Sequence, residues 1–187
     1  MTATAQAAPA TGAKTQWKLD PTHTSVEFSA KHLMITTVKG RIADVEGTIE
    51  IDERNPKNSS VEAVLKAASI DSRTTQRDDH LRSGDFLNVE KYPEIKFQST
   101  SIEGDNKEFK LTGDLTIRDV TSPITLEFTF EGETKDPWGG ERAGFSAKGK
   151  IDRREFGLTW NVALEAGGLT VGNEIKINIE VEAIKVG

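Results

Sequence analysis

From Ser69 to Phe97 the chain reads SIDSRTTQRDDHLRSGDFLNVEKYPEIKF, and here its hydrophobic pattern changes. On either side, apolar and polar residues alternate with the two-residue period typical of β-strands. Within the stretch the alternation stops. We predict one short helix over residues 75–83, with Leu81 as its only strong apolar anchor. A helix this short is marginal by itself, so we expect it to dock on the open end or the edge of a β-barrel.

Both ends of the predicted helix carry local signals. Thr75 and Asp78 fit a capping box, in which a hydroxyl caps the first turn and an acid three residues later answers it. Gly84 stands where a helix C-cap would place a glycine. The sequence therefore predicts a helix that is bounded by its own side chains.

Arg77 lies four residues before Leu81, so both side chains share one face of the predicted helix. If Leu81 docks on the barrel, Arg77 is drawn in with it and needs an anion, because charged groups are seldom buried unpaired. A structural pairing with Asp85 or Glu90 would meet this need. The functional alternative is a contact between Arg77 and the anionic head of a ligand.

Strand-like alternation covers most of the remaining chain. The odd-numbered step from Ile42 to Val45 predicts a β-bulge inside one of these segments. Turn signals separate neighbouring segments at 55–58, 104–107, Ser122-Pro123 and 136–140. The alternating segments number eight and cover residues 17–31, 38–51, 61–69, 95 to the turn at 104, 109–117, 124–130, 143–151 and 175–181.

Eight strands joined by hairpins indicate an all-β fold, an eight-stranded antiparallel up-and-down barrel, with a β-sandwich as the rival. The apolar faces mix large side chains such as Phe28 and Phe97 with small ones such as Ala63, Gly113 and Ala147. Small inward residues can leave room for one ligand inside such a barrel, or they can interdigitate with large ones in a dry core. The pattern leaves these two alternatives equal.

Composition limits the function classes. The 187 residues suit one domain, and the absence of cysteine excludes disulfides and cysteine-based metal or redox sites. A net charge of −6 argues against nucleic acid or an anionic membrane surface as the main partner. No apolar run is long enough to span a bilayer, and residues 1–16 lack the apolar core of a signal peptide, so we expect a disordered tail there and a domain over 17–187.

The histidines do not form a recognisable catalytic or metal motif. Asp78, Asp79 and His80 are adjacent, and adjacent side chains of a helix point in different directions, which disfavours a metal site. His23 precedes the first strand, where a turn residue is equally expected. His32 continues the inward face of Val26, so both a satisfied core histidine and a ligand contact stay open.

Four segments together resemble the YceI-like family. They read DPTHTSVEFSAKHL (20–33), SIDSRTTQRDDHLRSGDFLNVEKYPEIKFQST (69–100), LTGDLTIRDVTSPITLEF (111–128) and GFSAKGKIDRREFGLTWN (144–161), and they follow in the family's order. The family's RDxHL motif matches Arg77, Asp78, His80 and Leu81. Arg118-Asp119 stands where the family usually has His-Gly, so no role of that turn is carried over.

The resemblance implies a lipocalin-like barrel that binds a polyisoprenoid or another long amphiphilic lipid in an elongated pocket, without catalysis, cofactor or metal. An isoprenoid or quinone-like molecule is the expected ligand. Many members are periplasmic and stress-induced; with no leader in view, we expect a cytoplasmic carrier, and a homodimer is compatible with the family. The expected ligand-contacting residues are Val26, Phe28, His32, Leu65, Arg77, His80, Leu81, Phe86, Phe97, Leu115, Phe128, Phe145 and Trp160.

Two other functions compete with the lipid carrier. One is an enzyme of isomerase or cyclase type that acts on a bound lipid with His32 or His80 as its acid-base group. The other is a structural or partner-binding module in which the barrel has a dry core. Turnover would distinguish the first from a carrier, and the absence of a cavity would favour the second.

Overall fold

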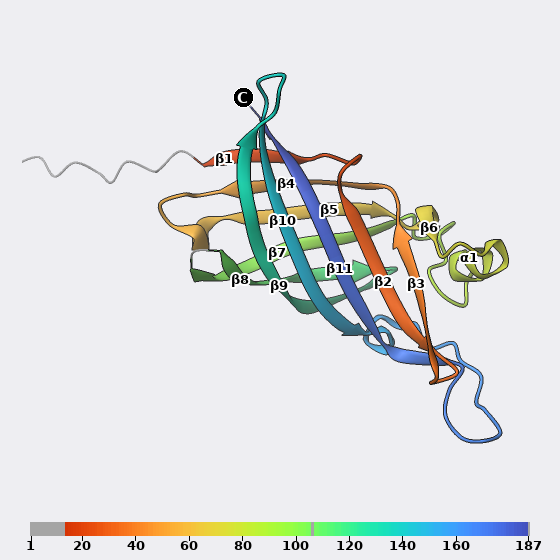
Figure 1. Ribbon diagram of the computed structural model, residues 1–187. Helices are drawn as coiled ribbons and strands as arrows, with labels where there is room; N and C mark the ends of the chain where they lie inside the picture. Colours follow the sequence, from red (N-terminus) through yellow and green to blue (C-terminus); the bar gives the residue numbers. More distant parts are fainter. Residues whose placement is uncertain (1–13, 106, 187) are drawn as a thin grey trace, which may run out of the picture.

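The structure is a computed structural model that describes residues 14–105 and 107–186. Eight antiparallel strands close into a barrel, in the order β1-β4-β5-β7-β8-β9-β10-β11, and β11 pairs with β1 to complete the ring (Figure 1). The barrel strands are β1 (Thr15–Leu19), β4 (Val45–Ile51), β5 (Ser60–Lys66), β7 (Glu94–Asp105), β8 (Glu108–Ile117), β9 (Val120–Lys135), β10 (Glu141–Asp152) and β11 (Val171–Val186). The predicted eight-stranded barrel is confirmed, and the β1–β11 pairing excludes the sandwich.

The sheet continues beyond the ring along the first half of β11. There β2 (Ser25–His32) pairs with β11, β3 (Thr36–Ile42) pairs with β2, and the two-residue β6 (Ile70–Asp71) pairs with β3. Three short 3-10 helices complete the backbone, η1 (Pro56–Asn58), η2 (Ala67–Ser69) and η3 (Arg153–Phe156). The first two predicted segments are thus each divided into two strands, one inside the ring and one in its extension.

The division between β3 and β4 replaces the predicted β-bulge. Ile42 and Val45 are both buried, as their apolar character requires, and the two residues between them leave the ladder. The backbone N–H groups of Ala43 and Asp44 donate to the backbone oxygen and to Oγ of Ser69, at 3.2 and 2.9 Å. The strand therefore shifts face by interruption, and Ser69 satisfies the backbone at the gap.

The predicted turn at Ser122-Pro123 is wrong. Both residues lie inside β9, where Pro123 is opposite Asp114 of β8, and the turn is made by Arg118 and Asp119. Pro123 is tolerated because β9 pairs with β10 only from Glu127 onward, so its missing N–H removes no bond from that ladder. Alternation alone did not distinguish a proline at a turn from one in a strand with a single neighbour.

The N-terminal boundary also needs correction. Strand β1 begins at Thr15, which pairs with Ile51 of β4, so the first strand starts two residues before the predicted start of the alternation at Trp17. Of the predicted tail over residues 1–16, residues 1–13 lie outside the described residues. Across the described part of the chain, no helix combines the length and the apolar character that crossing a membrane would need.

Helix α1 (Thr75–Arg82) agrees with the prediction to within one residue, but its capping differs. The N-cap is Thr74, whose side chain makes no capping bond, and Asp78 instead accepts hydrogen bonds from the backbone N–H and the hydroxyl of Ser72. At the other end the C-cap is Ser83 in an extended conformation, so Gly84 is not required there. The side chain of Asp78 therefore bonds to the segment before the helix and does not cap the first turn of the helix itself.

Candidate binding site in the barrel cavity

The interior of the barrel holds a cavity of about 430 Å³. Its wall is mainly aliphatic and aromatic, and it extends from the middle of the barrel to helix α1 and the segment after η3. A volume of this size lies in the range of roughly 300–1,000 Å³ that is common for small-molecule sites. A cavity of this size favours a binding barrel over the dry-core alternative.

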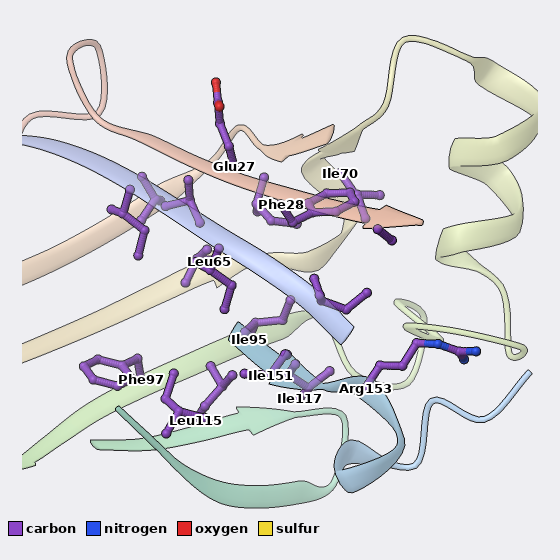
Figure 2. Close-up of a pocket in the computed structure, with 18 of the residues that line it drawn as sticks. Glu27, Phe28, Leu65, Ile70, Ile95, Phe97, Leu115, Ile117, Ile151 and Arg153 are labelled. Carbon is purple, nitrogen blue, oxygen red and sulfur yellow. The ribbon is translucent and has the colours of Figure 1, made fainter. Parts of the chain in front are cut away.

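Figure 2 shows how the wall is built. Phe28 and Ile70 lie on one side of the cavity, and Phe97 and Leu115 lie on the other, so their side chains face one another across the interior. The alternation of each strand produces this arrangement, because successive inward positions are two residues apart. Glu27, by contrast, points away from the interior, because it lies between the inward-facing Val26 and Phe28 on β2.

Glycines give the aromatic rings of the wall their space. A Cβ atom at Gly40 would lie 2.4 Å from Cζ of Phe28, and one at Gly113 would lie 2.4 Å from Cζ of Phe97. Neither contact is sterically possible without movement of the ring. The small inward residues therefore serve partly to seat large neighbours, and only the remainder of the missing volume becomes cavity.

One end of the cavity, called here the mouth, is bounded by three aromatic rings. His80 of α1 lies edge-on to Phe86, with ring centroids 5.0 Å apart, and to Trp160, at 4.5 Å. Phe86 and Trp160 lie 5.4 Å from each other. Nε2 of His80 is 2.9 Å from a carboxylate oxygen of Asp85, which fixes the orientation of the imidazole. These three residues, the mouth cluster, join the helix to the segment after η3.

Arg77 borders the same end but does not pair with Asp85 or Glu90 as predicted. Its Nε donates to the hydroxyl of Ser72 at 2.7 Å, and its Nη2 donates to the backbone oxygen of Ser72 at 2.7 Å and to Oγ1 of Thr74 at 3.1 Å. Asp85 is engaged by His80 instead. Arg77 therefore brings a positive charge to the mouth while neutral oxygens orient it.

Arg153 is a site residue that the sequence reasoning missed. It borders the cavity, is only 2% exposed, and is ion-paired with no carboxylate among the described residues. Its guanidinium donates to four backbone oxygens and to the side chain of Asn173; the backbone acceptors are Leu158, Trp160, Val171 and Gly172. Burial lowers the pKa of Arg153 from its usual value. The two-residue alternation of β10 could have identified Arg153, because position 153 continues the series of inward-facing positions that ends at Ile151.

The opposite end of the cavity is closed by stacked phenylalanines. Phe128 borders the cavity, and Phe145 stacks on it with centroids 5.3 Å apart and an interplanar angle of 21°. Phe130 lies 5.5 Å beyond Phe145. Phe145 is buried behind Phe128 and does not line the cavity, contrary to the prediction. The ring faces inward as its position requires, but it belongs to the floor.

The other predicted contact residues all border the cavity. They come from five strands, from two connections and from α1, so the fold brings together segments that are far apart in the sequence. His32 is the last residue of β2, opposite Val171 of β11, and lies toward the mouth. The residues in question are Val26, Phe28, His32, Leu65, Arg77, His80, Leu81, Phe86, Phe97, Leu115, Phe128 and Trp160.

A polar cluster lies at the closed end of the barrel, outside the cavity. Asp20, His23 and Glu182 place their ligand atoms within 4.8 Å of one another, the geometry that a metal ion would need. Arg142 already fills the centre, because its Nη1 is 2.8 Å from Asp20 and 2.6 Å from Glu182. Hydrogen bonds from Thr22, His23 and Arg142 hold the pKa of Asp20 well below its usual value. The cluster is thus neutralised by side chains.

The chain is similar in sequence to a known family and to several of its members. A family model described as the YceI-like domain matches residues 17–183. Protein YceI of Escherichia coli is 42% identical over 163 residues, which are 87% of this chain and 82% of that protein. Protein YceI of Salmonella newport is 38% identical over 172 residues, which are 91% of this chain and 87% of that protein.

Solved structures share the barrel. The YCEI protein of Campylobacter jejuni superposes with a TM-score of 0.70 at 35% identity, over 84% of this chain and 90% of that one. Burkholderia cenocepacia BcnA gives a TM-score of 0.75 at 18% identity, over 88% and 98% of the two chains. A polyisoprenoid binding domain from Saccharophagus degradans gives 0.68 at 11% identity, over 90% and 97%. At these two lower identities the likeness is one of fold.

Proposed function

The chain belongs to the YceI-like family, and from that premise we propose that it binds a polyisoprenoid or another long-chain amphiphilic lipid and carries it without chemical change. The observation that supports the proposal most strongly is the cavity of about 430 Å³ with its mainly apolar wall. A hydrocarbon chain is the kind of ligand that such a wall can bind without specific polar contacts. An isoprenoid alcohol or a quinone-like lipid has this chemistry.

The binding free energy would come from apolar burial. Each buried methylene contributes about 0.8 kcal/mol, so a dozen would supply roughly 10 kcal/mol before the costs of association. The wall residues of β5, β7 and β8, with Leu65, Phe97 and Leu115 among them, would contact the chain. Selectivity along the chain would be loose, because one methylene more or less changes the affinity only modestly.

The polar end of the ligand would meet the mouth. There the mouth cluster offers aromatic faces, and Arg77 offers a guanidinium that neutral oxygens hold in place. The head group of an amphiphile would therefore remain near α1, with its chain directed toward Phe128. The ligand would therefore lie along the barrel in a single orientation, with its head group at the mouth.

Native mass spectrometry of the purified full chain, followed by organic extraction, tests the proposal. We expect a stoichiometric adduct, or uptake of one equivalent when a polyisoprenoid alcohol is supplied on cyclodextrin. Leu115→Asp, which places a carboxylate on the wall, should retain the barrel by circular dichroism and lose the lipid. A protein that is free of lipid and takes up none would contradict the proposal.

A second candidate function is an enzyme acting on the bound lipid, and the His80–Asp85 pair at the mouth is the observation that favours it. A histidine oriented by a carboxylate is a common acid-base arrangement. Incubation of the loaded protein with analysis of the extracted lipid distinguishes the two. Unchanged lipid supports a carrier, whereas a product that disappears in His80→Gln would establish catalysis.

A further inference from the structure

Large apolar side chains that face solvent are concentrated at one end of the molecule. Leu33, Met34 and Ile35, in the turn between β2 and β3, are 38%, 53% and 83% exposed, and Val162 after η3 is 52% exposed. These four residues are called the apolar tip below. Among the described residues, the other two exposed large hydrophobics are Trp138 and Val186, which lie toward the opposite end of β11.

The backbone of the turn is unusual for the residues it holds. Leu33 and Met34 have φ angles of 51° and 61°, and the N–H of Ile35 donates to the backbone oxygen of His32 at 3.2 Å. A β-turn with positive φ at both central positions normally contains Asn-Gly there, because bulky residues are strained in that conformation. Leu and Met are therefore poor residues for the turn itself, which indicates that their side chains serve another purpose.

The apolar tip is continuous with the mouth of the cavity. The N–H of Leu33 donates to the backbone oxygen of Thr170 at 2.9 Å, and the N–H of Thr170 donates to that of Val162 at 3.0 Å. Thr170 and its neighbour Val171 border the cavity, as does His32 before the turn. Figure 1 shows the β2–β3 turn and the blue loop before β11 reaching out from the same end of the barrel.

Basic residues stand behind the tip on the outer face of the sheet. Lys39 of β3 and Lys176 of β11 both lie opposite Ser29 of β2, and Lys31 is two residues further along β2 toward the tip. None of these three lysines is within 4 Å of a carboxylate in the part of the chain that the structure describes, although the whole chain has a net charge of −6. These three lysines therefore form a group of cations without carboxylate partners behind the tip, although exposed Glu165 lies in the loop that carries Val162.

We propose that the apolar tip inserts into the surface of a bilayer that contains anionic phospholipid, and that lipid passes between this membrane and the cavity through the adjacent mouth. The proposal rests on the proposed function for its cargo. Hydrocarbon side chains backed by lysines are the combination by which peripheral proteins engage such surfaces. A protruding tip of four side chains is far smaller than the roughly 20–30 residues per partner of a stable protein interface, which argues against a second copy of the chain.

A variant that improves the turn while removing the tip gives a sharp test. Leu33→Asn/Met34→Gly installs the preferred Asn-Gly pair, and Ile35→Thr keeps a β-branched residue at the last position of the turn, directly before β3. We expect this triple variant to be at least as stable as the wild type in urea, because its turn is unstrained, and to bind vesicles at least tenfold more weakly. Vesicles of four parts phosphatidylcholine to one part phosphatidylglycerol, separated by flotation, provide the measurement.

Trp138→Ser is the matched control, because it removes the most exposed apolar side chain of the opposite end. It should float with vesicles as the wild type does. Flotation of the triple variant at the wild-type level, or loss of flotation in Trp138→Ser, would overturn the proposal. So would a change in sedimentation from dimer to monomer in the triple variant with unchanged flotation, which would make the tip a contact between copies.

Lipid uptake distinguishes the membrane-docking proposal from the proposed carrier function. With a polyisoprenoid alcohol supplied on cyclodextrin and no vesicles, the triple variant should load as the wild type does, because residues 33–35 do not line the cavity. A wild type that loads but does not float overturns the docking proposal and leaves the carrier function. A wild type that floats but never loads supports docking and removes the carrier function.

Discussion

Arg153 and Arg154 are neighbours with opposite surroundings, and they show how burial changes the role of a residue. Arg153 is buried and donates to four backbone oxygens, whereas Arg154 is exposed and, among the residues that the structure describes, pairs only with Asp152. We predict that Arg153→Met lowers the free energy of unfolding by about 3 kcal/mol, because several buried carbonyls lose their donor at once. Urea denaturation measures the change.

Arg154→Met is the control for this prediction. It removes the same charge one position away, and exposed ion pairs contribute little to stability. Its denaturation midpoint should match that of the wild type. Equal effects of the two substitutions would mean that the buried network around Arg153 does not organise the segment between η3 and β11.

We predict that part of the folding stability depends on pH through the protonation of His23. Its hydrogen bond to Asp20, and then the charge of Glu182, raise the pKa of His23 above its ordinary value of about 6.5. The folded state therefore binds the proton more tightly, so the stabilisation is complete below about pH 6.5 and disappears as the pH rises through the raised pKa. Asp20 stays ionised throughout this window, because its own pKa is depressed.

We therefore expect His23→Gln to lose most stability, relative to the wild type, near about pH 5.5 and least above about pH 8.5. Thermal denaturation of both proteins across this range measures the difference. A difference that stays constant with pH would show that His23 stabilises the turn by packing alone. A difference that grows with pH would contradict the direction of the shift.

At the scale of elements, the buried carboxylate of Asp78 joins helix α1 to the segment before it, as do Arg77 and Arg82. Asp78 is 6% exposed and accepts two hydrogen bonds from Ser72, the residue that also orients Arg77. We predict that Asp78→Ala frees the helix from the barrel, because eight residues with little apolar surface do not hold a helix by themselves. Hydrogen exchange should accelerate in peptides over 72–85 while those of β8 stay protected.

Asp79→Ala provides the comparison. Asp79 is exposed and pairs with Arg82 within the helix, so its loss should leave the exchange of α1 nearly unchanged. If both substitutions accelerate exchange equally, the helix responds to charge in general. The bonds between Asp78 and Ser72 would then not be what anchors it.

The capping of this helix marks the limit of local sequence reasoning. Alternation predicted the strands and their inward faces because one face of each strand must be buried, and the break in alternation located α1 to within one residue. Thr75 and Asp78 have the spacing of a capping box, yet Asp78 bonds to Ser72 because the chain enters the helix from β6. Spacing cannot show which donors the preceding segment will bring close.

At the scale of the whole molecule, period and composition predicted a closed barrel but not how far its cavity extends. Phe145 faces inward as predicted, yet it stacks behind Phe128 and becomes part of the floor. Arg153 also continues an inward series, yet its guanidinium is enclosed by backbone oxygens at the other end. Depth along the barrel depends on how rings from different strands stack, and a two-residue period carries no information about that.

The floor sets a length limit for a bound chain, and this limit can be moved. Ala147 borders the cavity between Phe128 of β9 and Ile179 of β11. Ile151 lies four residues farther along β10, roughly 13 Å nearer to the mouth. A phenylalanine at position 147 would add a ring to the deep half of the cavity. Because Ala147 borders the cavity, the cost in stability should be smaller than the about 1–3 kcal/mol of an overpacked core.

We therefore predict that Ala147→Phe binds long polyisoprenoid alcohols at least tenfold more weakly and retains shorter ones that end before the new ring. Competition between alcohols of different length, read by native mass spectrometry, measures the cut-off. Lys148→Phe adds the same ring to the outer face of the same strand and should leave the cut-off unchanged. An unchanged cut-off in Ala147→Phe would mean that the chain does not extend toward Phe128, so the ligand would have to lie nearer the mouth.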